Sequence, residues 1–125
     1  MSLLPPAKHL RQGKWAEQKA CEYLQSHGLR LRQRNFRCRY GEIDLIMTDG
    51  ECLTFIEVRY RRSTEFGHPA DTVDRRKQSK LRTTAACYLR DYGPADTQCR
   101  FDVFAISGSA DEIHVEWIKD AFDIA

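Results

Sequence analysis

No stretch of this 125-residue sequence approaches the roughly 20 apolar residues that a helix needs to cross a bilayer. The first residues, Met1 to Pro6, lack the basic start and long apolar run of a signal peptide. The five cysteines are odd in number and form no CxxC pair, which argues against a disulfide framework or a cysteine zinc site. We therefore expect a cytoplasmic protein with reduced thiols and no membrane partner.

Neither sign of charge dominates the whole chain, because the formal net charge is only +2. The charge is unevenly spread, however. Residues 1–40 hold nine basic and two acidic side chains, hence +7, whereas residues 41–125 hold eleven and sixteen, hence −5. A basic region of this kind is typical of surfaces that contact phosphate groups, and an ordinary solvated face would give the same count.

The length suits one domain, and an apolar content of 42% is enough for a core. We expect residues 1–11 to form a flexible N-terminal arm, because Pro5 and Pro6 block regular structure, and residues 12–125 to form a single domain. Apolar spacing predicts helices over about 13–27 and 73–92. Alternation predicts strands near residues 29–39, 42–48, 51–60, 100–106 and 112–118. This order indicates an α/β fold with a central mixed β-sheet flanked by helices on both faces.

The segment 42–60 carries the strongest local signal, because Asp49-Gly50 between two apolar runs predicts a hairpin turn. With that turn, Asp44 lies opposite Phe55 and Glu42 opposite Glu57. Alternation then divides the hairpin into two faces. One face carries Glu42, Asp44, Ile46, Leu53, Phe55, Glu57 and Arg59, and the other carries Ile43, Leu45, Met47, Cys52, Thr54, Ile56 and Val58.

Three carboxylates on one face repel one another, by roughly 3 kcal/mol for a pair about 5 Å apart at an effective dielectric constant of about 20. Such a cluster needs a cation or a proton to offset it. Arg59 is one candidate, and Mg²⁺ or Mn²⁺ is another, since both ions prefer oxygen ligands. The spacing alone leaves a metal site and a plain arginine–carboxylate network equally open.

Several motifs together resemble the YraN-type family of uncharacterised bacterial proteins, over about residues 11–106. They are Ala16-Glu17, Arg34-Asn35-Phe36-Arg37, Gly41-Glu42-Ile43-Asp44, Phe55-Ile56-Glu57-Val58-Arg59, Lys77 and Arg100-Phe101-Asp102-Val103. The resemblance implies a restriction-endonuclease-like fold, similar to archaeal Holliday-junction resolvases, and therefore a nuclease-like domain over residues 12–125.

The same resemblance implies a site. Glu17, Asp44 and Glu57 match a catalytic and metal-binding carboxylate set. Glu42 has no firm counterpart in the nuclease signature, and we expect it to support the set without contacting the metal. Arg59 stands where the family signature of such nucleases has a catalytic lysine. Arginine stays protonated at usable pH, so Arg59 stabilises charge but cannot act as a base.

Three functions follow as hypotheses. The first is a metal-dependent DNA endonuclease that hydrolyses phosphodiester bonds in structured or branched DNA. Its nucleic-acid contacts would come from Arg34, Arg37, Arg39, Arg61, Arg62 and Lys77. The second is a non-catalytic nucleic-acid-binding module on the same fold. The third is a protein-interaction module or homodimer that uses the acidic C-terminal segment, where Trp117 and Phe122 are either interface anchors or core residues.

Overall fold

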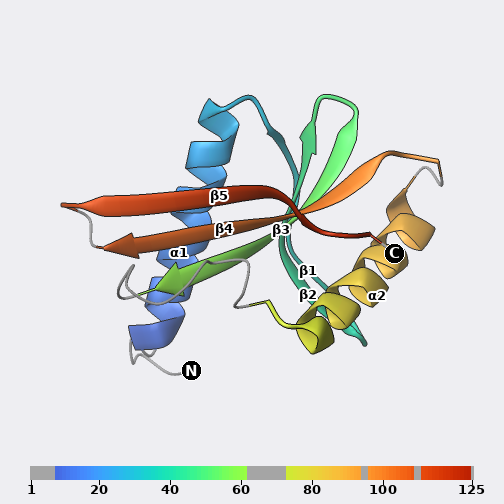
Figure 1. The fold of residues 1–125 in the computed structure, drawn as a ribbon, viewed down its shortest axis with the longest axis horizontal. Coiled ribbons are helices and arrows are strands. Elements are labelled where there is room, and N and C mark those ends of the chain that lie inside the picture. Colours follow the sequence, from blue (N-terminus) through green and yellow to red (C-terminus); the bar gives the residue numbers. More distant parts are fainter. Residues whose placement is uncertain (1–7, 62–72, 94–95, 109–110, 125) are drawn as a thin grey trace, which may run out of the picture.

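The computed structural model describes residues 8–61, 73–93, 96–108 and 111–124, with side chains described from residue 13 onward. Two helices and five strands make up these residues (Figure 1). In chain order they are α1 (Lys8–Ser26), β1 (Arg30–Cys38), β2 (Gly41–Asp49), β3 (Cys52–Arg61), α2 (Arg75–Tyr92), β4 (Cys99–Gly108) and β5 (Ile113–Phe122).

The strands form a single sheet in the order β1-β2-β3-β4-β5. Strands β3 and β4 are parallel, and the other neighbouring pairs are antiparallel. A parallel pair needs a crossover connection, and α2 lies in the segment that joins β3 to β4. The predicted α/β fold with a mixed sheet is therefore confirmed.

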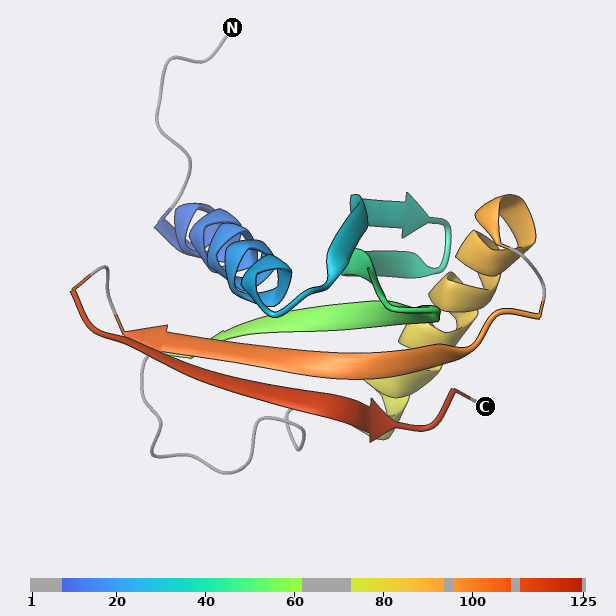
Figure 2. The same cartoon turned by 90° about the horizontal axis from the view of Figure 1, so that it is seen from above.

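Each face of the sheet is covered by one helix (Figure 2). Helix α1 packs Ala20 and Leu24 into a core that includes Leu45, Ile56 and Phe104. Helix α2 packs into a second core on the opposite face, whose members include Leu81, Tyr88, Ile46, Phe55 and Phe101. Because strand side chains alternate between faces, the central strands supply both cores and become apolar along most of their length.

The helix boundaries differ from those predicted at one end. Helix α1 begins at Lys8 rather than near Gly13, so the residues just before Gly13 are helical instead of belonging to an arm. The rest of the predicted arm lies outside the described residues. Helix α2 begins after Asp74, whose carboxylate accepts a hydrogen bond from the Lys77 N–H at 2.8 Å and so satisfies a free donor of the first turn.

A buried ion pair joins the last two strands, β4 and β5, to the hairpin. The Asp102 carboxylate, only 1% exposed, accepts hydrogen bonds from Arg100 Nε (2.9 Å), Trp117 Nε1 (2.9 Å) and the Asp120 N–H (3.0 Å). Asp120 has a φ of 52° and lies in a bulge of β5 opposite Asp102. Arg100 also contacts Asp49 at 2.9 Å. We call these groups the Asp102 cluster. The motif Arg100-Phe101-Asp102-Val103 therefore has a structural role, because Arg100 and Asp102 form this ion pair.

Trp117 and Phe122 pack against the body of the protein. Trp117 lies edge-on to Tyr23 of α1, and Phe122 stacks on Phe101 with ring centres 4.7 Å apart. These contacts support the core role.

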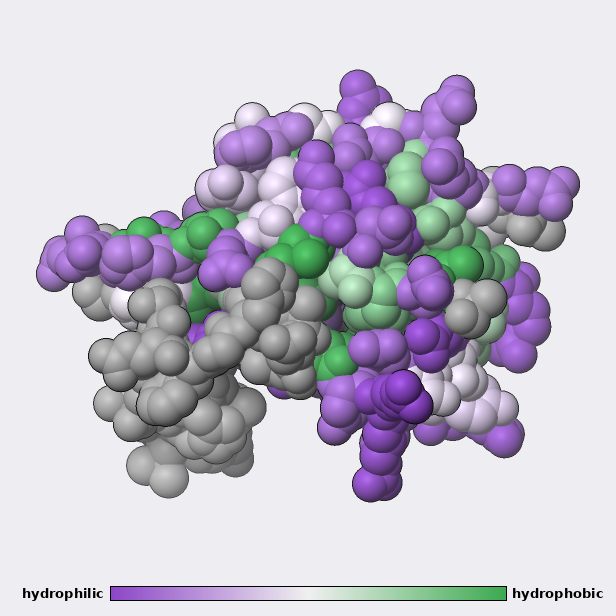
Figure 3. All heavy atoms as spheres, viewed as in Figure 1, coloured by the Kyte–Doolittle hydropathy of each residue, from purple (hydrophilic) through white to green (hydrophobic). Residues whose placement is uncertain are grey.

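In Figure 3, hydrophilic side chains cover the upper part of the viewed face and the outer side of α2, with apolar side chains between them. Among the described residues, neither helix is long and apolar enough to span a bilayer.

Candidate functional site at a fork in the sheet

The sheet opens between β2 and β3. These strands pair from their turn as far as Leu45 and Ile56, where the described pairing ends. Figure 1 shows them diverging below the hairpin: β2 continues with β1 toward α2, and β3 continues beside β4. We call the gap between Asp44 on β2 and Val58 on β3 the fork. Asp44 Oδ2 accepts a hydrogen bond from the Val58 N–H at 2.8 Å, so the side chain satisfies a donor that a paired strand would have used.

The hairpin turn lies one residue later than predicted. Asp49 pairs with Cys52, so Gly50 is the first of the two turn residues, and its φ of 60° suits glycine. The register therefore moves by two residues. An even shift by itself does not change the face on which a side chain of a regular strand lies, and it brings Asp44 level with Glu57 instead of Phe55.

The predicted faces are wrong beyond Asp44. Alternation placed Ile43 on the face of Leu45 and opposite to that of Ile46. In the structure Ile43 packs with Ile46 in the α2-side core, whereas Leu45 packs in the α1-side core. The alternation of β2 is therefore interrupted at Asp44.

The neighbouring strand shows the physical reason. Asn35 has a φ of 51°, a left-handed conformation that reverses the side-chain alternation of β1. Arg34 pairs with a residue of the α1-side core, and Phe36 pairs with a residue of the α2-side core. We call the paired ends of β1 and β2 beyond this twist, residues 36–38 and 41–43, the arm of β1 and β2. The arm is turned over relative to the rest of these strands, so Glu42 lies with Arg37 on the α1 side and does not share the face of Glu57.

Asn35 also connects two carboxylates. With its NH₂ turned toward them, its amide donates to Glu17 Oε1 at 2.9 Å and to Glu42 Oε1 at 3.0 Å. Glu17 lies on α1 beside the fully buried Cys21 and Leu24. Burial raises the pKa of Glu17, the Asn35 amide opposes this effect, and the charge of Glu42 adds to it. Helix α1 thus contributes a carboxyl group to the fork, as the resemblance implied.

Asp44 has the most perturbed carboxyl group of the fork. Desolvation by burial and the charges of Glu57 and Glu17 together raise its pKa to about 8, whereas the Val58 N–H opposes the shift. The shift favours the protonated form of Asp44 in the isolated protein. The structure brings Asp44, Glu57 and Glu17 together, since the charges of Glu57 and Glu17 act on Asp44 and the charge of Glu57 also acts on Glu17.

Basic side chains offset part of the negative charge. Lys77 Nζ of α2 lies 3.6 Å from Glu57 Oε2, whose side chain is 10% exposed. Arg37 Nε lies 3.4 Å from Glu42 Oε2 in a more exposed pair. Arg59 follows Glu57 by two residues on β3, which places both side chains on the same face.

The carboxylates suit a divalent ion by their chemistry. In the described residues no three His, Cys, Asp or Glu side chains meet closely enough, as arranged, to hold a metal. Glu17, Asp44 and Glu57 nevertheless offer the oxygen ligands that Mg²⁺ and Mn²⁺ prefer. Their mutual repulsion, expressed in the raised pKa of Asp44, is what a bound cation would reverse.

The predicted nucleic-acid-binding residues do not all lie at the fork. Arg34 is close enough to Glu17 to lower its pKa, and Arg37 pairs with Glu42. Arg39 lies at the β1–β2 turn with its guanidinium 4.9 Å from the centre of the Tyr40 ring. Arg62 is outside the described residues.

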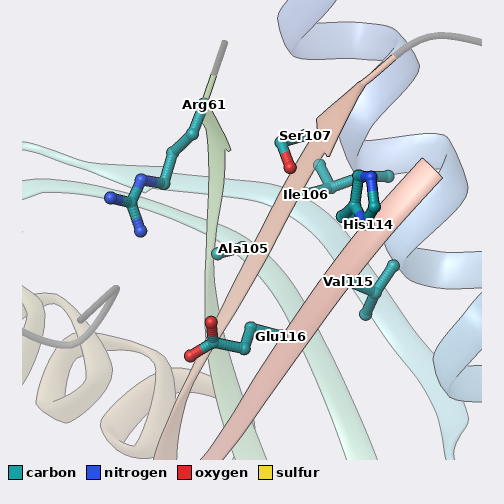
Figure 4. Close-up of a pocket in the computed structure, with 7 residues that line it drawn as sticks. All are labelled: Arg61, Ala105, Ile106, Ser107, His114, Val115 and Glu116. Carbon is teal, nitrogen blue, oxygen red and sulfur yellow. The ribbon is translucent and has the colours of Figure 1, made fainter. Parts of the chain in front are cut away.

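Arg61 lies apart from this group. It lines a small cavity of about 40 Å³ over the ends of β3, β4 and β5, together with Ser107 and Glu116. Figure 4 shows Arg61 and Glu116 directed to the same side of these strands. A volume of this size suits a water molecule rather than a substrate. We therefore place the candidate site at the fork and not at this cavity.

Two residues at the fork had no predicted part in the carboxylate cluster. The motif that contains Asn35 assigns it no role of its own, although asparagine adopts a left-handed backbone more readily than most residues do. Lys77 was expected to contact nucleic acid, and its ion pair with Glu57 could not be read from the sequence because the two residues lie on different elements.

A five-stranded mixed sheet with one helix on each face, and carboxylates gathered where two strands diverge, defines a restriction-endonuclease-like α/β protein. The family model for the Uncharacterised protein family UPF0102 matches residues 16–106. The chain belongs to this family, and the YraN-type resemblance drawn from its motifs is confirmed.

Similar proteins carry the same family name. A UPF0102 protein of Nitrosococcus oceani is 49% identical over 122 residues, which cover 97% of this chain and 98% of the relative. One of Pseudomonas fluorescens is 45% identical over 121 residues, or 96% of this chain and 99% of the relative. One of Coxiella burnetii is 47% identical over 110 residues, or 87% and 89%. These names describe no activity, so they establish the family and not its function.

Proposed function

We propose that this protein binds nucleic acid at the fork and hydrolyses phosphodiester bonds there with the help of Mg²⁺ or Mn²⁺. The observation that carries the proposal is the carboxyl group of Asp44, half-buried beside Glu57 and Glu17 with its pKa raised to about 8. Grouping like charges in a partly buried gap destabilises a fold, and such strongly shifted groups are concentrated at functional sites.

The residues divide the work by their chemistry. Asp44, Glu57 and Glu17 would hold the ion, which when bound lowers the pKa of water and offsets phosphate charge. Arg59 remains protonated and can hold a phosphate group but not remove a proton. Arginine occupies the position on β3 where the nuclease signature has a lysine. Lys77 brings an amine to Glu57 from α2, on the same side of the fork.

The nucleic acid would lie across the arm of β1 and β2. Arg34 and Arg37 on β1 and Arg39 in the turn that follows it are exposed. DNA with branches or other structure is the substrate that the fold suggests, by analogy only. Arg61 and Arg62 would extend the contact for a longer duplex. The free thiols of the described cysteines support the cytoplasm as the place of action.

A cleavage assay tests the proposal directly. Purified protein is incubated with linear, branched and single-stranded DNA in Mg²⁺ or Mn²⁺, and nicks are counted on denaturing gels. Asp44→Asn should abolish nicking, whereas Glu22→Gln, an exposed carboxylate on α1, should not change it. Complete absence of nicking by the wild type on every substrate would reject hydrolysis. Calorimetric titration with Mn²⁺ should show binding to the wild type and none to Asp44→Asn.

Arg59 in the lysine position specifically favours a second function, a nucleic-acid-binding module that does not cleave. In that case Asp44→Asn retains full affinity for DNA, and arginine-to-alanine changes on β1 weaken it. A protein-interaction module or homodimer would instead show a stable protein complex in sedimentation and no affinity for nucleic acid. The three functions therefore give different results in the same set of assays.

A further inference from the structure

Two thiols meet where the β1–β2 turn touches α2, away from the fork carboxylates. Cys87 of α2 is buried in the α2-side core, and Cys38, the last residue of β1, is half-buried against the same core. The two thiols are close enough for each to shift the pKa of the other. Both cysteines are free thiols.

The backbone holds this contact tightly. Gly41, with a φ of 155°, comes so close to α2 that an added Cβ would lie 3.0 Å from Thr84 Oγ1. Thr84 is three residues before Cys87, so it lies on the same side of the helix. Glycine is required at this approach, and the sulfur atoms are kept as neighbours by the same packing.

The two thiols differ in their surroundings. Burial acts against ionisation of Cys38, but hydrogen bonds from the Tyr40 N–H (3.4 Å), Cys87 and the Gly41 N–H outweigh it and lower the pKa of Cys38. Burial and the neighbouring Cys38 raise the pKa of Cys87, whose Sγ accepts a hydrogen bond from Arg90 Nη2 at 3.3 Å. A half-exposed thiol that ionises readily beside a buried second thiol is the arrangement found at redox-sensitive cysteines.

We propose that Cys38 and Cys87 are a peroxide-reactive dithiol, in which a hydroperoxide oxidises Cys38 and Cys87 then closes a disulfide with it. The Cys38 thiolate attacks the outer peroxide oxygen, the O–O bond breaks, and the products are Cys38 sulfenic acid and water or an alcohol after protonation. The Cys87 sulfur attacks the Cys38 sulfur, the S–O bond breaks, and water leaves with the Cys87 proton. The protein loses two hydrogen atoms, and the hydroperoxide is reduced.

The disulfide would tie the arm that carries Arg37 and Arg39 to the helix that carries Lys77. Forming it requires the sulfur atoms to approach to about 2 Å. The arm and the helix already pack against each other, so this needs only a local adjustment. Oxidation would therefore fix one side of the fork relative to α2.

The chain offers a matched control in Cys52 and Cys99. The charge of Cys52 acts on Cys99, so these thiols are also near each other. Each of them donates to a backbone carbonyl, Cys52 to Leu53 at 3.9 Å and Cys99 to Thr97 at 3.5 Å. Burial raises the pKa of Cys99, which makes it a poor nucleophile.

The test treats reduced full-length protein with hydrogen peroxide, alkylates the remaining thiols and maps peptides by mass spectrometry. We expect a linked Cys38–Cys87 peptide in the wild type and in Cys52→Ser. We expect no link in Cys38→Ser, and in Cys87→Ser a sulfenic acid on Cys38 that dimedone labels at least about tenfold faster than any other cysteine.

Two results would overturn the proposal. One is that a Cys52–Cys99 link forms before any Cys38–Cys87 link, and the other is that dimedone labels the four remaining cysteines of Cys87→Ser equally. Circular dichroism of each serine variant confirms that it is folded before the comparison. None of these readouts depends on cleavage or binding of nucleic acid, so the dithiol is tested separately from the proposed function.

Discussion

At the scale of single residues, Asp44 connects the structure of the fork with its chemistry. Its Oδ2 accepts the Val58 N–H and so replaces a missing strand-to-strand hydrogen bond. The same carboxyl group lies half-buried near those of Glu57 and Glu17, and its pKa is raised from 3.8 to about 8. An asparagine at this position keeps an oxygen acceptor for Val58 and removes the charge, so the two roles can be separated.

Asp44→Asn should change how stability depends on pH. A folded-state pKa above the unfolded value means that the folded protein holds the proton more tightly. The stability that protonated Asp44 contributes is complete below about pH 3.8 and is lost as pH rises through about 8. Urea unfolding in a chelator at about pH 5, 7 and 9 should show this loss in the wild type and a flatter profile in Asp44→Asn. Parallel profiles would contradict the raised pKa, and Glu22→Gln should follow the wild type.

Asn35 is the second residue whose backbone and side chain have separate roles. Its φ of 51° is costly for alanine, by about 1–2 kcal/mol, and free for glycine. Asn35→Ala should therefore lower the free energy of unfolding by about that amount, and Asn35→Gly by less. Both variants lose the bridge between Glu17 and Glu42, so both should weaken Mn²⁺ binding in calorimetry. Equal stability losses in the two variants would show that the left-handed backbone is not the cause.

At the scale of elements, sequence patterns identified the strands and helices because hydrophobic periodicity is strong in this chain. The face assignment was correct from the hairpin turn to Asp44, since an error of two residues in the register does not change alternation. It was wrong for Ile43 and Glu42, because alternation assumes a regular strand and the twist at Asn35 is set by a single φ angle.

The Asp102 cluster gives a prediction at this scale. Asp102→Ala would leave Arg100 and the Trp117 N–H without their buried acceptor, and removing one partner of a buried ion pair costs about 3–5 kcal/mol. We expect urea unfolding to show a loss of this size. Asp49→Ala removes the more exposed partner of Arg100, with a side chain 33% exposed, and should cost clearly less. Equal costs would mean that the contact of Arg100 with Asp49 contributes as much as the buried contacts of Asp102.

At the scale of the whole molecule, the site consists of residues from α1, β1, β2, β3 and α2. The hairpin pattern grouped Glu42, Asp44, Glu57 and Arg59 on one face, and the family resemblance singled out Asp44 and Glu57 and added Glu17 from α1. The fork itself could not be predicted, since it depends on where β2 stops pairing with β3. The contact between Lys77 and Glu57 could not be predicted either, because local sequence patterns do not determine how α2 crosses the sheet.

The uneven charge of the chain leads to a prediction for the whole surface. Strand β1 belongs to the basic first third of the sequence. Arg34 lies at the fork, whereas Arg30 lies at the other end of the strand beside Thr48. Each phosphate contact contributes about 0.9 to the slope of log K against log salt. With branched DNA in a chelator, fluorescence polarisation between about 50 and about 200 mM salt should give Arg34→Ala a slope smaller by about 1. Arg30→Ala should keep the wild-type slope, and identical slopes for both variants would place the nucleic acid away from the fork.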